Sequence, residues 1–215
     1  MSSAFNNYNN IYKFYDNFEV PSSLASTNVG LSTYNGWQVS AANKFWIESN
    51  STIGMKMGET PFDNHGKIYE GYACVHVWEP TDTNIYAFKN IGTNLTNYYL
   101  QARIYKTAGI AFIMFKSGNK QYRIGFDTRW KVGTVGGWGS DTIYTSRLNQ
   151  FVKMRAYINP YGVTAWTETN TAFVGNDNYL TSFDDIGFGV TGSTKEVFFD
   201  EVILYPLHLN TLDNP

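Results

Sequence analysis

The sequence predicts an all-β protein, built as an antiparallel sandwich of two sheets. Alternation of apolar and polar residues with a period of two runs through most of the 215 residues, whereas no stretch keeps the period of an amphipathic helix. Turn signals rich in glycine and asparagine separate the alternating runs, for example SGN at 117–119 and NPYG at 159–162. Many short strands joined by such turns favour a sandwich over parallel βαβ units.

The alternating runs define the expected strands and the domain limits. One sandwich domain is expected at 12–206, preceded by an Asn-rich arm at 1–11 and followed by a tail at 207–215. The glycine-rich stretch 135–141 is expected to be a flexible loop rather than a strand. The strands are expected at 12–20, 36–40, 44–49, 52–57, 67–79, 84–89, 97–106, 109–116, 120–127, 129–135, 150–158, 161–168, 185–191 and 196–205.

Three of these strands separate into a core row and a second, more polar row. In 97–106, Leu100, Ala102 and Ile104 form the core row, and the strands 120–127 and 150–158 repeat the pattern. Such a second row is typical of an antiparallel sheet with one face open to water. The polar rows are unusually rich in rings and guanidinium groups, and they contain Tyr99, Gln101, Arg103, Tyr105, Arg123, Asp127, Arg155 and Tyr157.

Composition and charge exclude several classes of function. The net charge is −2 and the isoelectric point near 5.9, so the chain lacks the basic footprint of a nucleic-acid binder, and no apolar run is long enough for membrane insertion. Cys74 is the only cysteine, which excludes an internal disulfide. Aromatic residues reach 17% and charged residues 16%, a composition that predicts an extracellular or virion-surface protein, although residues 1–10 do not form a signal peptide.

A series of motifs in the second half of the chain follows a familiar order. QYRIGFD precedes FVKMRAY, then a glycine turn, a strand ending at Trp166, IGFG and finally FDEV. This order, over about residues 97–206, resembles the concanavalin A-like lectin/glucanase (laminin-G-like) jelly-roll family, and YDNFEV with GWQVS resembles its first strand. Galactose-binding-like carbohydrate modules share the opening and closing motifs. The resemblance implies a jelly roll whose first and last strands are neighbours.

Two aspartates occupy positions where the alternation places core residues. Asp16 falls in the row of Phe14, and Asp200 in the row of Phe198 and Val202. A carboxylate on a core row must be paired, hydrogen-bonded or bound to a metal. If the terminal strands are neighbours, as the resemblance implies, the two carboxylates can bind a structural Ca²⁺. The alternative is that each accepts backbone N–H bonds at a strand end.

The polar rows and the tryptophans predict a carbohydrate-binding surface. Proteins bind sugar rings with flat aromatic side chains and hydrogen-bond the hydroxyls with arginine, asparagine, glutamine or aspartate. Trp130 and Trp138, expected in the glycine-rich loop, and Trp166 join the residues of the polar rows as candidates. The same residues are also good strand formers, and cross-strand arginine–tyrosine pairs stabilise ordinary exposed sheets.

Three functions compete at this stage. The first is a non-catalytic carbohydrate-binding or adhesion module displayed on a cell or virion surface, whose partner is a glycan or polysaccharide. The second is a structural subunit or decoration protein of a virion or surface filament, which self-associates when residues 1–11 add a strand to a neighbouring sheet. The third is a polysaccharide hydrolase or lyase. We expect no enzyme, because no spacing pairs two carboxylates across a cleft.

Overall fold

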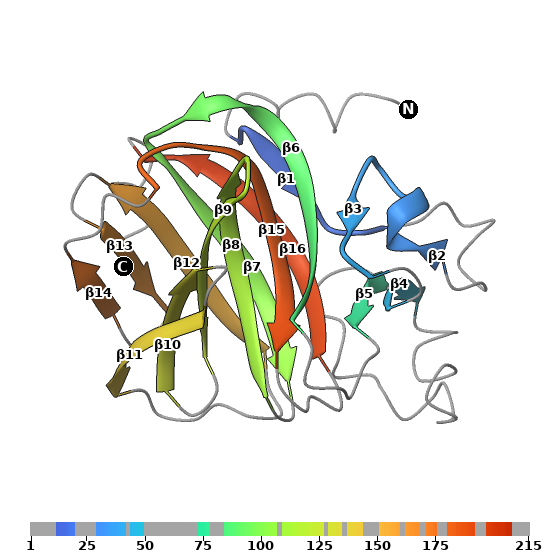
Figure 1. Ribbon diagram of the computed structural model, residues 1–215. Helices are drawn as coiled ribbons and strands as arrows, with labels where there is room; N and C mark the ends of the chain where they lie inside the picture. Colours follow the sequence, from blue (N-terminus) through green and yellow to red (C-terminus); the bar gives the residue numbers. More distant parts are fainter. Residues whose placement is uncertain are drawn as a thin grey trace.

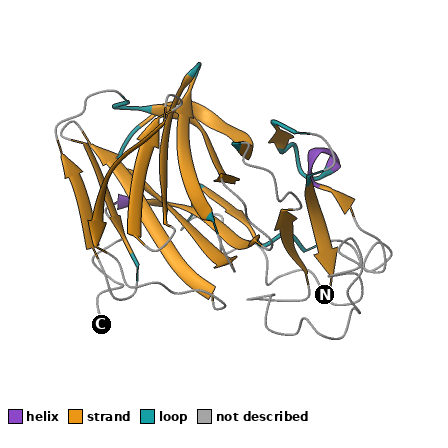
Figure 2. Cartoon of the chain, turned by 60° about the horizontal axis from the view of Figure 1, so that its bottom comes forward, coloured by secondary structure: helices purple, strands orange, loops and turns teal. Residues whose placement is uncertain are grey.

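The protein is a two-layered sandwich of antiparallel strands, as the alternation predicted (Figure 1). Strands account for most of the described residues, which include one short 3₁₀ helix, η3 (Leu31–Thr33) (Figure 2). No helix in this part of the chain has the length and apolar character needed to cross a membrane. The computed structural model describes residues 12–19, 29–41, 44–49, 73–77, 84–106, 109–126, 129–134, 137–143, 151–159, 162–167, 171–175, 180–191 and 197–207.

One layer, which we call sheet A, contains nine of the described strands. β1 (Phe14–Asp16) joins it by pairing with β16, so the two ends of the sandwich are neighbours. The other strands follow one another in the order β14 (Thr171–Gly175), β13 (Gly162–Trp166), β12 (Phe151–Asn159), β7 (Tyr98–Lys106), β16 (Val197–Pro206), β5 (Ala73–Val77), β4 (Phe45–Ser49) and β2 (Val29–Gly30).

The second layer, sheet B, contains the other seven described strands. Three consecutive hairpins build one half of it, from β8 to β11, and β15 joins this half to β6. The order is β11 (Gly137–Ile143), β10 (Arg129–Thr134), β9 (Lys120–Phe126), β8 (Ile110–Ser117), β15 (Phe183–Thr191), β6 (Ile85–Leu95) and β3 (Gln38–Val39).

The hydrophobic core lies between the two sheets. Leu100, Ala102 and Ile104, expected as the core row of β7, are completely buried. From opposite sheets, the rings of Phe188 and Phe199 stack at a centroid distance of 4.5 Å. Burial of such side chains supplies most of the favourable free energy of folding, at roughly 1.5–3 kcal/mol for each large apolar residue.

Strand pairing corrects one predicted loop and adds one strand that was not predicted. The stretch 135–141 is not a loop throughout, because β10 and β11 pair as a hairpin in which Gly133 lies opposite Trp138. Glycines weaken strand propensity, but pairing with a neighbouring strand overrides that preference. β14 was also missed, and the expected strand at 52–57 lies outside the described residues.

A bulge in β16 decides which of its side chains face the core. Asp200 lies opposite Arg103 and Ile203 lies opposite Gln101, so β16 carries one residue more than β7 between these pairs. The backbone of Glu201 is left-handed there, with φ of 51°. Phe198 and Asp200 therefore lie on the outer face of sheet A, whereas Val202, opposite Asp16, faces the core. The expectation that Asp200 shares a row with Val202 is wrong for this reason.

Asp16 lies on the core side of the sheet and is held by four hydrogen bonds. Its Oδ1 accepts from the backbone N–H of Phe18 at 2.9 Å and from the hydroxyl of Tyr34 at 3.3 Å. Its Oδ2 accepts from Asn35 Nδ2 at 3.1 Å and from Trp37 Nε1 at 2.9 Å. These bonds tie β1 to the turn that precedes β3. They also hold Trp37 against Phe188, at a centroid distance of 5.0 Å.

The structure does not bring Asp16 and Asp200 together as a shared metal site. The two carboxylates point to opposite faces of sheet A, and each accepts a backbone N–H bond instead, with Glu201 N donating to Asp200 Oδ1 at 2.8 Å. The alternative of backbone acceptance at a strand end is therefore confirmed for Asp16, which ends β1, whereas Asp200 accepts its backbone bond at the bulge within β16. Among the described residues, no three histidine, cysteine, aspartate or glutamate side chains gather to hold a metal ion.

Close approach of neighbouring strands explains two glycines of the IGFG motif. Gly187 lies opposite Met114 on β8, and Gly189 lies opposite Phe112. A Cβ atom on Gly187 would lie 2.2 Å from the carbonyl oxygen of Ala87 and 2.6 Å from the Cε of Met114. The glycines thus allow the side chains of Phe112 and Met114 to lie flat against β15.

The Asp16→Asn substitution is expected to lower the free energy of unfolding by about 2–4 kcal/mol, because an amide nitrogen would face a donor in a buried site. Urea unfolding measures the change. Asp184→Asn is the control, since this partly exposed carboxylate accepts, among the described residues, from Asn94 N and Ser117 Oγ. A loss for Asp16→Asn no larger than that of the control would contradict the role of the network.

The Gly187→Ala substitution is expected to destabilise the protein by about 2–3 kcal/mol, because the added methyl group meets a backbone carbonyl that cannot move aside. The matched control is Gly30→Ala, where the nearest atoms to an added Cβ are 3.9 Å and 4.0 Å away. Thermal unfolding of the two variants compares them directly. Equal melting temperatures for the two variants would show that β15 and its neighbours move apart around the added methyl group at little cost in free energy.

Candidate functional site

A row of aromatic side chains crosses the outer face of sheet A. It runs from β1 over β16 and β7 to β12 and β13. We call its six members the aromatic row: Tyr12, Tyr15, Tyr99, Tyr157, Trp166 and Tyr205. Successive ring centroids are 5.8 Å apart for Tyr15 and Tyr12, 4.8 Å for Tyr12 and Tyr205, 4.6 Å for Tyr205 and Tyr99, 5.7 Å for Tyr99 and Trp166, and 6.0 Å for Trp166 and Tyr157.

The members of the aromatic row differ in their exposure. Tyr99 is 1% exposed and serves as packing under its neighbours, so the expectation that it is open to water is wrong. Tyr15 is 39% exposed, and Tyr157, Trp166 and Tyr205 are half-buried. The row therefore presents ring faces or edges at both of its ends.

A polar row lies beside the aromatic row, because Gln101 is two residues from Tyr99 on β7 and Arg155 is two residues from Tyr157 on β12. Arg155 on β12 lies opposite Gln101 on β7 and opposite Trp166 on β13. Arg155 Nε donates to Gln101 Oε1 at 2.8 Å, and Gln101 itself is 2% exposed. Gln101 thus orients the guanidinium of Arg155. The expectation that Gln101 is open to water is wrong. In the described part of the chain, the terminal nitrogens of Arg155 have no partner.

The second arginine of the polar row is already paired. Arg103 Nε donates to Glu201 Oε2 at 2.9 Å, and both side chains are mostly buried. This ion pair holds the bulge of β16 against β7. Arg103 is therefore occupied by a structural ion pair, whereas the terminal nitrogens of Arg155 are the ones in this row that can bind a ligand.

Burial raises the pKa of the Tyr205 hydroxyl above its ordinary value, and the neighbouring Tyr12 and Tyr99 add to the effect. The hydroxyl consequently stays protonated at physiological pH, and it can both donate and accept hydrogen bonds. Tyr205 was not predicted as a site residue. The bulge at Glu201 brings it to the outer face, and no signal in the alternating pattern indicates a bulge.

The opposite end of this face is an apolar cluster. The rings of His76 and Phe198 stack at 4.4 Å, and Tyr105 packs on Phe198 at 5.9 Å and on Phe151 at 5.6 Å. Cys74, His76 and Phe198 are buried. Tyr105, a predicted ligand residue, is thus part of a packed cluster distant in register from Trp166.

The remaining predicted residues do not lie on this face. Arg123 is on β9 of sheet B, so the expectation that it shares a surface with Arg155 is wrong. Trp130 belongs to β10 and Trp138 to β11, also in sheet B, whereas Asp127 lies outside the described residues. The sequence separates the two faces of each strand, but it does not say which strands share a sheet.

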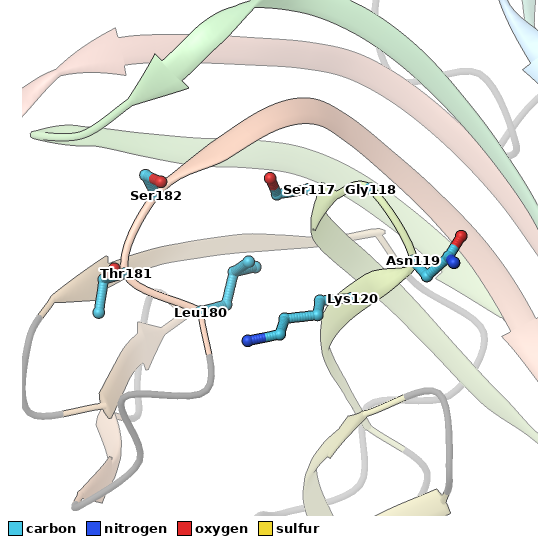
Figure 3. Close-up of a pocket in the computed structure, with 7 residues that line it drawn as sticks. All are labelled: Ser117, Gly118, Asn119, Lys120, Leu180, Thr181 and Ser182. Carbon is cyan, nitrogen blue, oxygen red and sulfur yellow. The ribbon is translucent and has the colours of Figure 1, made fainter.

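A separate pocket of about 510 Å³ opens between the β8–β9 turn and the segment before β15 (Figure 3). Among the walls that the structure describes, Leu180 is the one apolar side chain other than the stems of polar residues, and none of these walls is an aromatic ring. The described walls therefore offer no flat ring surface on which a sugar could stack. Its walls are Ser117, Gly118, Asn119, Lys120, Leu180, Thr181 and Ser182.

Comparison with known proteins identifies the fold and no closer relationship. No protein-family model matches the chain, and no curated protein matches it. Similar solved structures include a sialidase, with 9% identity over 84% of this chain and 18% of that chain (TM-score 0.50). A family 16 glycosyl hydrolase from Mycobacterium smegmatis is 13% identical over 90% and 100% of the chains (TM-score 0.48).

The carbohydrate-binding module CBM66 from Bacillus subtilis is 11% identical and matches 61% of this chain and 86% of that chain (TM-score 0.48). At such identities the likeness concerns the fold alone. The class of protein is thus an antiparallel β-sandwich of jelly-roll type, the fold that the motif order implied.

Proposed function

We propose that the protein is a non-catalytic carbohydrate-binding module, and that the aromatic row of sheet A is its binding surface. One observation carries the proposal: Tyr157 and Trp166 lie in edge contact beside Arg155, whose terminal nitrogens have no described partner. Half-buried rings offer apolar surface to the C–H face of a sugar, and a fixed guanidinium binds the hydroxyls at its rim.

The extent of the row favours a chain of sugars over a single ring. It spans β1, β16, β7, β12 and β13, and neighbouring strands lie about 4.8 Å apart, so its length is roughly 19 Å. Strands hold every member except Tyr12, which precedes β1, and Gln101 fixes Arg155 at 2.8 Å. A surface that is already ordered loses little conformational entropy when a ligand binds.

The carboxylates of this face support binding without catalysis. Hydrolysis of a glycosidic bond requires two carboxyl groups facing the substrate. Asp200 is completely buried and accepts the N–H of Glu201, and Glu201 is bound to Arg103. Neither described carboxylate is placed to exchange protons with a sugar. Display on a cell or virion surface is part of the proposal, because a polar, weakly charged chain suits that location.

The Trp166→Ala substitution is expected to weaken binding to a retained polysaccharide by about tenfold or more, since stacking on one aromatic ring contributes on the order of 1–2 kcal/mol. Affinity electrophoresis against a panel of neutral polysaccharides measures the change. Trp46→Ala is the matched control, because Trp46 is a half-buried tryptophan on β4 of the same sheet, away from the aromatic row. If no polysaccharide retards the unmodified protein, or if both variants bind equally, the proposal fails.

The Gln101→Leu substitution is expected to reduce affinity about three- to tenfold, because Arg155 loses the bond that orients it. Arg155→Gln is expected to cost at least as much, and the double variant no more than Arg155→Gln alone. Isothermal titration with the best polysaccharide from the panel tests this coupling. Additive losses would show that Gln101 does not act through Arg155.

A further inference from the structure

Arg123 is a buried cation on the outer face of sheet B, the face opposite the aromatic row. It lies in the middle of β9, opposite Met114 on β8, and is 4% exposed. Its Nε and Nη2 both donate to Gln121 Oε1, at 3.0 Å and 2.8 Å. The guanidinium carbon is 5.5 Å from the ring centroid of Tyr86 and 5.2 Å from that of Phe112. None of these partners carries a negative charge.

An acid of the same face, Asp185, is already neutralised. Lys116 lies opposite both Gln121 and Asp185, and its Nζ donates to Asp185 Oδ2 at 2.6 Å. Lys116 also lies 4.5 Å from the ring centroid of Phe88. The charges of Lys116 and Asp185 cancel each other. The positive charge of Arg123 is therefore not balanced by any carboxylate of the described residues.

An uncompensated buried charge costs free energy, and the protein retains it here. Burial lowers the pKa of the Arg123 guanidinium from its ordinary value, which shows how little its surroundings compensate. The two aromatic rings recover part of the cost through cation–π attraction. A ligand that carries an anionic group would supply the rest, because arginine binds carboxylate and sulfate oxygens with two parallel hydrogen bonds.

Gln121 orients a second donor toward the same place. Because two N–H groups of Arg123 point at one atom of the amide, that atom is the oxygen, and the amide nitrogen Nε2 is directed elsewhere. Gln121 is 4% exposed. Within the part of the chain that the structure describes, neither Gln121 Nε2 nor Nη1 of Arg123 has a hydrogen-bond partner. Two adjacent donors without an acceptor are a pre-formed site for an oxyanion.

The geometry points to an anion subsite on sheet B, in which Arg123 and Gln121 bind the carboxylate or sulfate group of an acidic saccharide. Tyr86 is half-buried and flanks the guanidinium, so apolar ring surface lies beside the charge, as a sugar requires and a bare ion does not. The net charge of −2 provides no general attraction for polyanions, so this contact must be local. The subsite lies on the other face of the sandwich and does not depend on the aromatic row.

The test compares Arg123→Met with the unmodified protein. Methionine keeps much of the apolar stem that packs on Phe112 and removes the charge. Binding of chondroitin sulfate, polygalacturonate, neutral dextran and inorganic sulfate is measured by titration at constant ionic strength. We expect one of the acidic polysaccharides to bind, and its affinity to fall at least about tenfold in Arg123→Met. Lys120→Gln is the control, since it removes an exposed positive charge from the same strand, and it is expected to bind as the unmodified protein does.

Each other outcome overturns the inference. If Arg123→Met binds as tightly as the unmodified protein, or if the unmodified protein binds no acidic polysaccharide, the subsite does not exist. If the protein responds to inorganic sulfate alone, the ligand is not a saccharide. Should Arg123→Met fail to fold, Gln121→Leu keeps the arginine and is expected to weaken the same binding. Trp166→Ala, altered on the opposite face, is expected to keep the acidic response, which separates failure here from failure of the aromatic row.

Discussion

The bulge in β16 is the constraint on which the arrangement of sheet A depends. One extra residue, Glu201, stands in a left-handed conformation and reverses the faces of everything after it. Before the bulge β16 pairs with β5, and after it β16 pairs with β1, so the same irregularity makes room for the first strand. It also turns Tyr205 outward onto Tyr99. The Arg103–Glu201 ion pair closes the bulge, and in this way a structural contact determines the candidate binding surface.

Two aspartates illustrate how a β-sandwich accommodates buried carboxylates. Asp16 organises a turn from within the core, and its hydrogen bonds hold Phe18 in a left-handed conformation with φ of 59°. Asp200 stabilises the bulge by accepting the N–H of Glu201. Both satisfy irregular backbone groups that no ladder partner reaches, Asp16 from the core side of sheet A and Asp200 from its outer face.

The two outer faces differ in the kind of recognition they offer. Sheet A presents rings at both ends of a continuous row, with one oriented guanidinium, and suits a neutral, extended ligand. Sheet B presents a buried charge between Tyr86 and Phe112, and glycines on β15 let the surrounding side chains lie flat. Because the two faces point in opposite directions, the two proposed sites would let one chain contact two polymers or two segments of one polymer.

The amino-acid sequence alone determined the fold class and the positions of strands β7, β9 and β12. It also determined the division of each of these strands into a core row and a polar row, because alternation with a period of two is a local property. The tertiary structure decided which rows share a sheet. Only strand pairing separates Arg123 from Arg155, makes strands of the glycine-rich stretch around Trp138, and brings Tyr12, Tyr205 and Tyr99 together. Contacts between residues that are distant in sequence leave no trace in the local pattern, and neither does a single-residue bulge.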